Sequence, residues 1–125
     1  MILFCGIPSE PPLRLAIEAA EAAATPHLVF NQREAHFSDL SFDLEGDSVR
    51  GRLRHRETDY PLEDFTGVYT RLTDWKTLPE NRPARGASPD AGRVERSRLV
   101  HEALGEWLEL RVRDGRTHTE HVVAQ

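Results

Sequence analysis

The sequence has a single cysteine and no long apolar run, and each shortage excludes a class of structure. With Cys5 alone, the chain can form neither an internal disulfide nor a metal site built from several thiolates. Cys5 lies inside the apolar run 1–7, which predicts a small buried side chain rather than a nucleophile. No stretch approaches the length of a membrane span, and the first residues lack the pattern of a signal peptide. We therefore expect a cytoplasmic protein without a membrane partner.

Lysine is nearly absent as well, since Lys76 is the only one, and the net charge is −5. Arginines cluster in 50–56 and in 93–98, and acidic residues flank the first cluster and intersperse the second. An acidic domain with mixed charge is a poor ligand for a polyanion, so we expect local ion pairs and no nucleic-acid partner. His118 and His121 have a spacing that a metal could use. They stand alone in a polar terminal stretch, so we expect no metal site.

The common catalytic and nucleotide-binding motifs are missing too. The chain has neither a P-loop nor a GxSxG nucleophile motif. After the apolar run 1–7, a dinucleotide-binding protein would have GxGxxG, but this chain has Gly-Ile-Pro-Ser-Glu-Pro-Pro. Two prolines remove N–H donors that would hold a phosphate, and Glu10 adds a negative charge. This turn therefore argues against an NAD-type enzyme.

What the sequence does contain is the pattern of an α/β domain. The run 1–7 predicts a strand buried on both faces, followed by a helix that Ser9 opens and Thr25 closes. A second strand over 27–31 completes a βαβ unit. Alternating apolar residues over 40–53 predict a β-hairpin with charged residues on its outer face. We expect a Rossmann-like fold of three or two layers, with a mostly parallel sheet and this antiparallel β-hairpin added.

The candidate site residues lie where predicted strands end. A short apolar stretch that includes Tyr69 predicts a buried strand, and Arg71 and Asp74 follow at its carboxyl end. Asn31 and Arg33 end the second predicted strand, and polar side chains in such places can line a ligand crevice. An ordinary polar loop is an equally good interpretation of that second pair.

Arg71 has two interpretations. An arginine at a strand end can bind a carboxylate or phosphate through two parallel hydrogen bonds. The alternative is an ion pair with Asp74 or Glu80, which chemistry alone slightly favours. No histidine is placed beside these residues by sequence, so no residue is predicted to be catalytic.

The last third of the chain divides into three parts. Residues 74–93 are rich in proline, arginine, glycine and serine, which predicts a mobile loop. A helix is expected from about 93 to 110, with an apolar face. Residues 111–125 form a polar tail, with a short strand at 121–124 as an alternative. We thus expect one domain over 1–110 followed by a tail.

Several phrases of the chain resemble one known family, the RimK-like and glutathione-synthetase-like ATP-grasp proteins. They are Met1–Pro12, Val29–Arg33, Gly67–Asp74, Leu78–Glu80 and His101–Leu108. They resemble the small pre-ATP-grasp domain that stands at the N-terminus of those proteins. The resemblance implies a role in ATP-dependent ligation of a carboxylate to an amine or thiol through an acyl phosphate. The family's ATP and magnesium ligands belong to the ATP-grasp module, so the resemblance implies no cofactor within this chain.

The resemblance leads to one main hypothesis and two alternatives. The main one is a truncated or stand-alone pre-ATP-grasp domain that positions substrate or a partner, and has no ATP-dependent activity alone. Its partner would be an ATP-grasp module. The first alternative is a small ligand-binding or self-associating domain, since the packed face of the last helix and the strand edges could drive homodimer formation. The second is a small α/β enzyme that uses Tyr69, Arg71 and Asp74.

Overall fold

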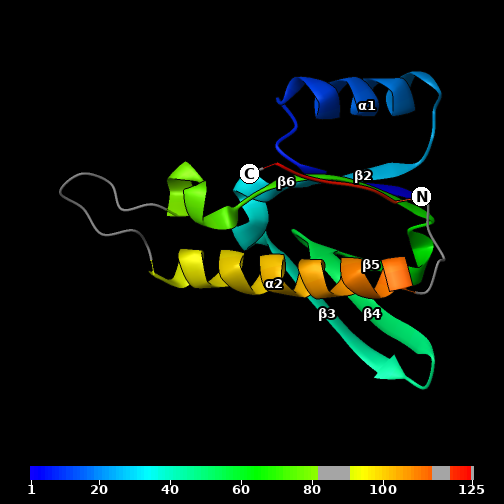
Figure 1. Ribbon diagram of the computed structural model, residues 1–125, viewed down its shortest axis with the longest axis vertical. Coiled ribbons are helices and arrows are strands. Elements are labelled where there is room, and N and C mark those ends of the chain that lie inside the picture. Colours follow the sequence, from blue (N-terminus) through cyan, green and yellow to red (C-terminus); the bar gives the residue numbers. More distant parts are fainter. Residues whose placement is uncertain (82–90, 114–118, 125) are drawn as a thin grey trace.

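The structure, a computed structural model, describes residues 1–81, 91–113 and 119–124 (Figure 1). One sheet is parallel, with strand order β2-β1-β6-β7. Its strands are β1 Ile2–Gly6, β2 His27–Asn31, β6 Gly67–Thr73 and β7 Thr119–Ala124. The other sheet is antiparallel, with β3 Ser38–Glu45, β4 Ser48–His55 and β5 Thr58–Pro61 in that order. The chain is therefore a mixed α/β protein, and the predicted parallel sheet and antiparallel hairpin are both present.

The two long helices cover opposite faces of the parallel sheet, as Figure 1 shows. They are α1 Pro11–Ala22 and α2 Ala91–Arg113. Four short 3-10 segments connect the other elements: η1 Gln32–Phe37, η2 Leu62–Asp64, η3 Trp75–Thr77 and η4 Pro79–Asn81. The antiparallel sheet lies on the same side as α2, which contacts β3 and η1.

The strand β1 is buried on both faces, which explains its unbroken apolar sequence. Leu3 and Cys5 belong to the large core cluster on the α2 side, whereas Phe4 packs with Leu13 and Ile17 on the α1 side. Cys5 is 0% exposed, and burial raises the pKa of its thiol well above its ordinary value. The prediction that Cys5 is a small buried hydrophobe is confirmed.

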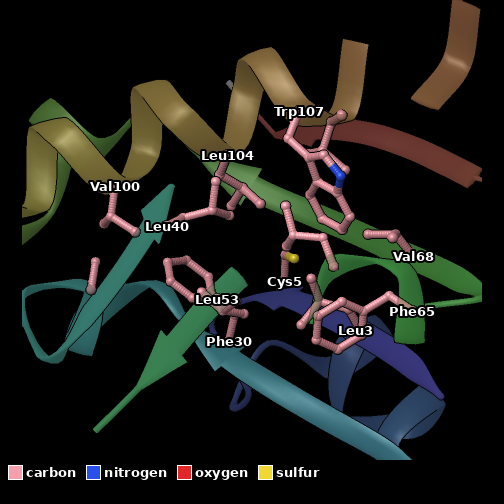
Figure 2. Packing of buried hydrophobic residues seen from close by; sticks show 13 residues of the cluster. Leu3, Cys5, Phe30, Leu40, Leu53, Phe65, Val68, Val100, Leu104 and Trp107 are labelled. Carbon is pink, nitrogen blue, oxygen red and sulfur yellow. The ribbon is translucent and has the colours of Figure 1, made fainter. Parts of the chain in front are cut away.

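The larger core lies between α2 and the two sheets (Figure 2). Leu104 and Trp107 of α2 are each at most 2% exposed, and the Trp107 ring meets Phe65 edge-on at 6.1 Å between centroids. Leu40 and Leu53 bring the antiparallel sheet into the same cluster. The apolar face of α2 is thus covered from within the chain. Homodimer formation through this helix or the strand edges stays a prediction.

The outer face of the antiparallel sheet carries the predicted ion pairs. Arg50 lies 3.4 Å from Glu45, across the turn of the β3–β4 hairpin. Arg52 and Arg54 both bind Asp59, with N–O distances of 3.1 and 2.7 Å. The cross-strand pairing was expected within the hairpin. Asp59 instead belongs to β5, so the third strand supplies the acidic partner for two of the arginines.

Several element boundaries differ from the prediction. The N-cap residue of α1 is Glu10 rather than Ser9, and its side chain makes no capping hydrogen bond. The predicted loop over 74–93 contains η3 and η4, and Leu78 between them is 2% exposed because it packs into the protein. Residues 82–90 of that loop lie outside the described part. The helix α2 runs over 91–113, and the tail contributes β7, which pairs with β6.

A matched pair of glycine substitutions tests how closely the hairpin is packed. A Cβ at Gly51 would lie 2.1 Å from the Ser41 carbonyl oxygen and 2.6 Å from Phe42 Cα. We expect Gly51→Ala to lower the free energy of unfolding by about 1–3 kcal/mol, the usual cost of overpacking. A Cβ at Gly105 in α2 meets nothing within 4 Å, so Gly105→Ala should raise it by about 0.5–1 kcal/mol. Urea unfolding midpoints measure both, and equal shifts would contradict this description of the hairpin.

Candidate functional site

The carboxyl ends of β1, β2 and β6 lie at one edge of the parallel sheet. The register pairs Gly6 at the end of β1 with Asn31 on one side and with Arg71 on the other. In open parallel sheets, ligands bind outside the carboxyl ends of the strands. The favoured position is where two neighbouring strands send their connections to opposite faces, because the two crossovers separate there and leave a crevice.

In this sheet the neighbouring strands β1 and β6 meet that condition. The chain leaves β1 through α1 and returns as β2, whereas the chain after β6 reaches β7 by way of α2. The helices α1 and α2 lie on opposite faces (Figure 1). We therefore take the carboxyl ends of β1 and β6 as the candidate site and call it the switch-point site. Its central residues are Gly6, Glu10, Tyr69 and Arg71.

An ion pair between Arg71 and Glu10 occupies the switch-point site. The Arg71 guanidinium donates its Nε–H to Glu10 Oε1. The two side chains are 23% and 26% exposed, so they are mostly buried but reachable from solvent. The hydrogen bond and negative charge of Glu10 raise the pKa of Arg71 above its ordinary value, and Tyr69 contributes in the same direction. From the sequence we expected the partner of Arg71 to be Asp74 or Glu80; the structure gives it Glu10, 61 residues earlier.

Gly6 allows the two strand ends to lie this close together. Its φ is +149°, a backbone conformation that side chains disfavour. A Cβ at this position would lie 2.9 Å from the Arg71 carbonyl oxygen and 3.0 Å from Leu13 Cδ2. A side chain at this position would therefore clash with the Arg71 backbone and with α1.

The other predicted site residues have local structural roles. The Asn31 side chain accepts a hydrogen bond from Arg33 N–H at 3.0 Å and thereby caps η1. The Asp74 carboxylate caps η3 in the same way, accepting from Lys76 N–H at 3.0 Å. Tyr69 contacts Arg71, and its ring meets Phe4 edge-on at 6.0 Å between centroids. Of the predicted set, the structure places Tyr69 and Arg71 at the switch-point site, whereas the side chains of Asn31 and Asp74 cap η1 and η3.

A buried polar network centred on Gln32 lies beside this site, and no sequence pattern predicts it. This side chain is 1% exposed. Its amide donates to the Thr73 carbonyl at 2.7 Å and its oxygen accepts from Thr73 N–H at 2.8 Å, so that it pairs with β6 as a strand would. The second amide hydrogen faces His101 Nε2 at 3.2 Å. A glutamine just after a strand is typical of an exposed loop, so the sequence pattern did not predict that Gln32 is buried.

These contacts fix the protonation state of His101. Because the Gln32 amide nitrogen is only a donor, Nε2 of His101 has to accept, and the proton lies on Nδ1. Nδ1–H then donates to the Ser97 carbonyl at 2.7 Å, one turn earlier in α2. Burial lowers the pKa of His101 below its ordinary value, although the Ser97 carbonyl and the charge of Asp74 oppose this shift. His101 is therefore a neutral connector between β2, β6 and α2.

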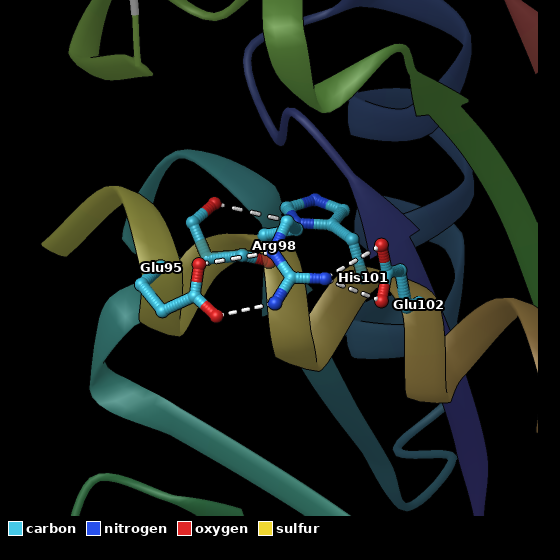
Figure 3. Close-up of polar contacts among 5 residues, drawn as sticks. Glu95, Arg98, His101 and Glu102 are labelled. Atoms are coloured by element: carbon cyan, nitrogen blue, oxygen red, sulfur yellow. Dashed lines mark hydrogen bonds and ion pairs between the residues drawn. The ribbon is translucent and has the colours of Figure 1, made fainter. Parts of the chain in front are cut away.

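The network continues into η4. Asn81 donates to the Trp75 carbonyl at 2.9 Å and to Ser97 Oγ at 3.1 Å. These two hydrogen bonds of Asn81 connect η3 and η4, the short segments after β6, to α2. They explain why part of the predicted loop has a defined structure. Figure 3 shows His101 beside a set of ion pairs in α2, in which Arg98 binds both Glu95 and Glu102. Those carboxylates are about half exposed, and the set stabilises the helix surface without touching the switch-point site.

The described residues offer neither a metal site nor a membrane span. Among them no three His, Cys, Asp or Glu side chains gather closely enough to hold a metal ion. His118 and the side chain of His121 lie outside the described part. The described helices also include none that is long and apolar enough to cross a membrane.

Comparison with known proteins relates this fold to ATP-grasp ligases. Neither a protein-family model nor a curated protein matches the chain. Among solved structures, it is similar to the macrocyclase MdnC bound with precursor peptide MdnA from Microcystis aeruginosa MRC. The TM-score is 0.52 and the identity 17%, over 85% of this chain and 31% of that one. It is also similar to a RiPP-associated ATP-grasp ligase from Chryseobacterium gregarium in complex with ADP and a leader and core peptide. Here the TM-score is 0.51 and the identity 17%, over 97% of this chain and 34% of that one.

At this identity the likeness is one of fold. The chain shares the fold of part of these two enzymes and spans about a third of their length. One of the two is an ATP-grasp ligase, the class of protein that the sequence phrases resemble.

The buried histidines predict how stability depends on pH. His55, like His101, has its pKa lowered from 6.5, mainly by burial. The unfolded chain therefore takes up protons from about pH 6.5 downward while the folded chain resists them. Stability should be fully present above that pH and should fall as the pH drops through the lowered values. One histidine contributes a slope of at most roughly 1.4 kcal/mol per pH unit.

Urea unfolding between pH 5 and 8 measures this slope. The variant His101→Gln removes one of the two histidines whose pKa is lowered, so only the contribution of His55 to the slope should remain. Stability that stays level or rises toward pH 5 would show that His101 is not held neutral by its surroundings.

Proposed function

We propose that this chain is a pre-ATP-grasp domain that forms the substrate-facing wall of an ATP-grasp ligase. The observation that carries the proposal is the fold likeness, which takes in most of this chain but about a third of each ligase. The phrases that resemble RimK-like proteins support the same assignment. In this proposal the ATP-grasp module, a partner of this domain, supplies the ATP and magnesium ligands.

The geometry of the switch-point site supports a role without phosphate chemistry. Helix N-termini hold phosphates through free backbone N–H groups. Here Pro11 and Pro12 occupy the first turn of α1, and the Glu10 carboxylate lies at the same end. A phosphate would meet a negative charge and too few donors. The acyl phosphate step would therefore belong to the module, and this domain would position the reactant.

The reactant that we propose is a peptide. Both ligases of similar fold were solved with peptides: the one with its precursor peptide, the other with a leader and core peptide. The carboxyl edge of the parallel sheet is the part of this chain that supports such a role. There a reachable arginine lies beside a wall that the Gln32 and His101 network holds in place.

Calorimetry with magnesium-ATP tests the absence of nucleotide binding. We expect no saturable heat when magnesium-ATP is titrated into this chain alone, because the first turn of α1 lacks phosphate-binding N–H groups. An ATP-grasp module from the same genome, titrated in parallel, provides the positive control. Tight ATP binding by this chain alone would overturn the proposal.

A further inference from the structure

In the switch-point site, Arg71 binds the Glu10 carboxylate in the way that an arginine in a binding site binds the carboxylate of a ligand. Arg71 presents a planar guanidinium at the strand end, and a carboxylate from the chain itself already lies against it. Both partners are about a quarter exposed, so the pair faces solvent on one side. An arginine that binds an internal carboxylate in such a place has the geometry to bind an external one.

Glu10 is free to leave without unwinding α1. It is the N-cap residue, yet its side chain makes no capping hydrogen bond. The start of the helix is fixed by the backbone instead. Glu10 N–H donates to the Ile7 carbonyl at 3.0 Å, and the Glu10 carbonyl accepts from Arg14 N–H at 2.8 Å. Pro11 and Pro12 preset the helical φ of the first turn. Rotation of the Glu10 side chain would therefore expose Arg71 while the helix stays in place.

The chemistry around Arg71 selects for a carboxylate. The planar fork of a guanidinium matches the two oxygens of a carboxylate. Tyr69 adds a hydrogen-bonding hydroxyl beside the arginine. A phosphate matches the same fork but has further oxygens to satisfy, and the prolines of this turn leave it few backbone donors.

We propose that Arg71, with Tyr69, is a carboxylate-binding site in which Glu10 acts as an internal ligand that an incoming carboxylate displaces. Exchange of one carboxylate for another leaves the arginine paired before and after, so neither state holds an unpaired, partly buried charge. The external ligand is a carboxylate carried by a peptide or by a small acid. This inference concerns binding by the chain itself, and it holds whether or not an ATP-grasp module is the partner.

Binding of a capped Ala-Glu-Ala peptide, followed by NMR titration, tests the proposal in four forms of the chain. Glu10→Gln removes the internal competitor, so we expect it to bind the peptide at least about tenfold more tightly than the native chain. The matched control is Glu18→Gln, which removes one negative charge from α1, where Glu18 forms only an exposed ion pair with Arg14. It should bind as the native chain does. Glu10→Gln combined with Arg71→Gln should lose the gain.

Three further probes define the ligand class in the Glu10→Gln chain. The matching Ala-Gln-Ala peptide should bind at least tenfold more weakly than Ala-Glu-Ala. Glutarate, a free acid, distinguishes a small ligand from a peptide: equal binding indicates that the carboxylate alone is recognised, and weaker binding indicates that the peptide backbone also contributes. Inorganic phosphate should bind more weakly than glutarate.

Two results would overturn the inference. Equal affinities of the Glu10→Gln and Glu18→Gln chains for Ala-Glu-Ala would show that the ion pair is purely structural. Equal affinities of the Glu10→Gln chain for the Glu and Gln peptides would show that no carboxylate is recognised. If the double variant does not fold by circular dichroism, the comparison of the two single variants decides alone. ATP binding plays no part in these measurements, so their failure is separate from a failure of the proposed function.

Discussion

The parallel pairing of β1 with both β2 and β6 is the constraint on which the rest of the structure depends. Both edges of β1 are hydrogen-bonded in register, and both of its faces are buried, with Leu3 and Cys5 on one side and Phe4 on the other. A strand closed on four sides has to be apolar throughout and requires cover above and below the sheet. The helix α1 and the layer formed by α2 and the antiparallel sheet provide that cover.

The same pairing produces the site. Because the connections after β1 and β6 run to opposite faces, the carboxyl ends of these strands form the switch point, and Glu10 and Arg71 meet there from distant parts of the chain. Next to this site, side-chain hydrogen bonds of Gln32 connect the segment after β2 to β6 and α2. Gln32 joins β6 through two backbone hydrogen bonds and holds His101 of α2 in one tautomer. A hydrogen-bonded strand edge beside the Glu10–Arg71 ion pair supports the proposed role in positioning a ligand.

The sequence was sufficient for those features that depend on local pattern. Periodicity and turn residues predict the buried first strand, the βαβ unit, the hairpin and the strand around Tyr69, which in the structure continues through Arg71 to Thr73. The partner of Arg71 did not follow, because Glu10 comes close only after β1 and β6 have paired. The network of Gln32 and His101 was missed for the same reason: its polar groups are far apart in sequence, and nothing local distinguishes a buried glutamine from an exposed one. Asn31 and Asp74, predicted at ligand-facing strand ends, also cap η1 and η3, and the sequence pattern of a cap is present at both positions.

The distance in sequence between β1 and β6 also governs how the chain reaches this fold. Ile2 pairs with His27 on one side and with Gly67 on the other. The strand β1 is therefore synthesised first but is among the last to be paired on both edges. Non-local parallel contacts of this kind slow folding, because the loop between them has to close before any pairing compensates for its lost entropy. During synthesis the edge of β1 that pairs with β6 stays without its partner until more than half of the chain has been made. The apolar segment around Leu3 and Phe4 lies in this strand. The interval is one in which chaperone binding or premature association would compete with the native pairing.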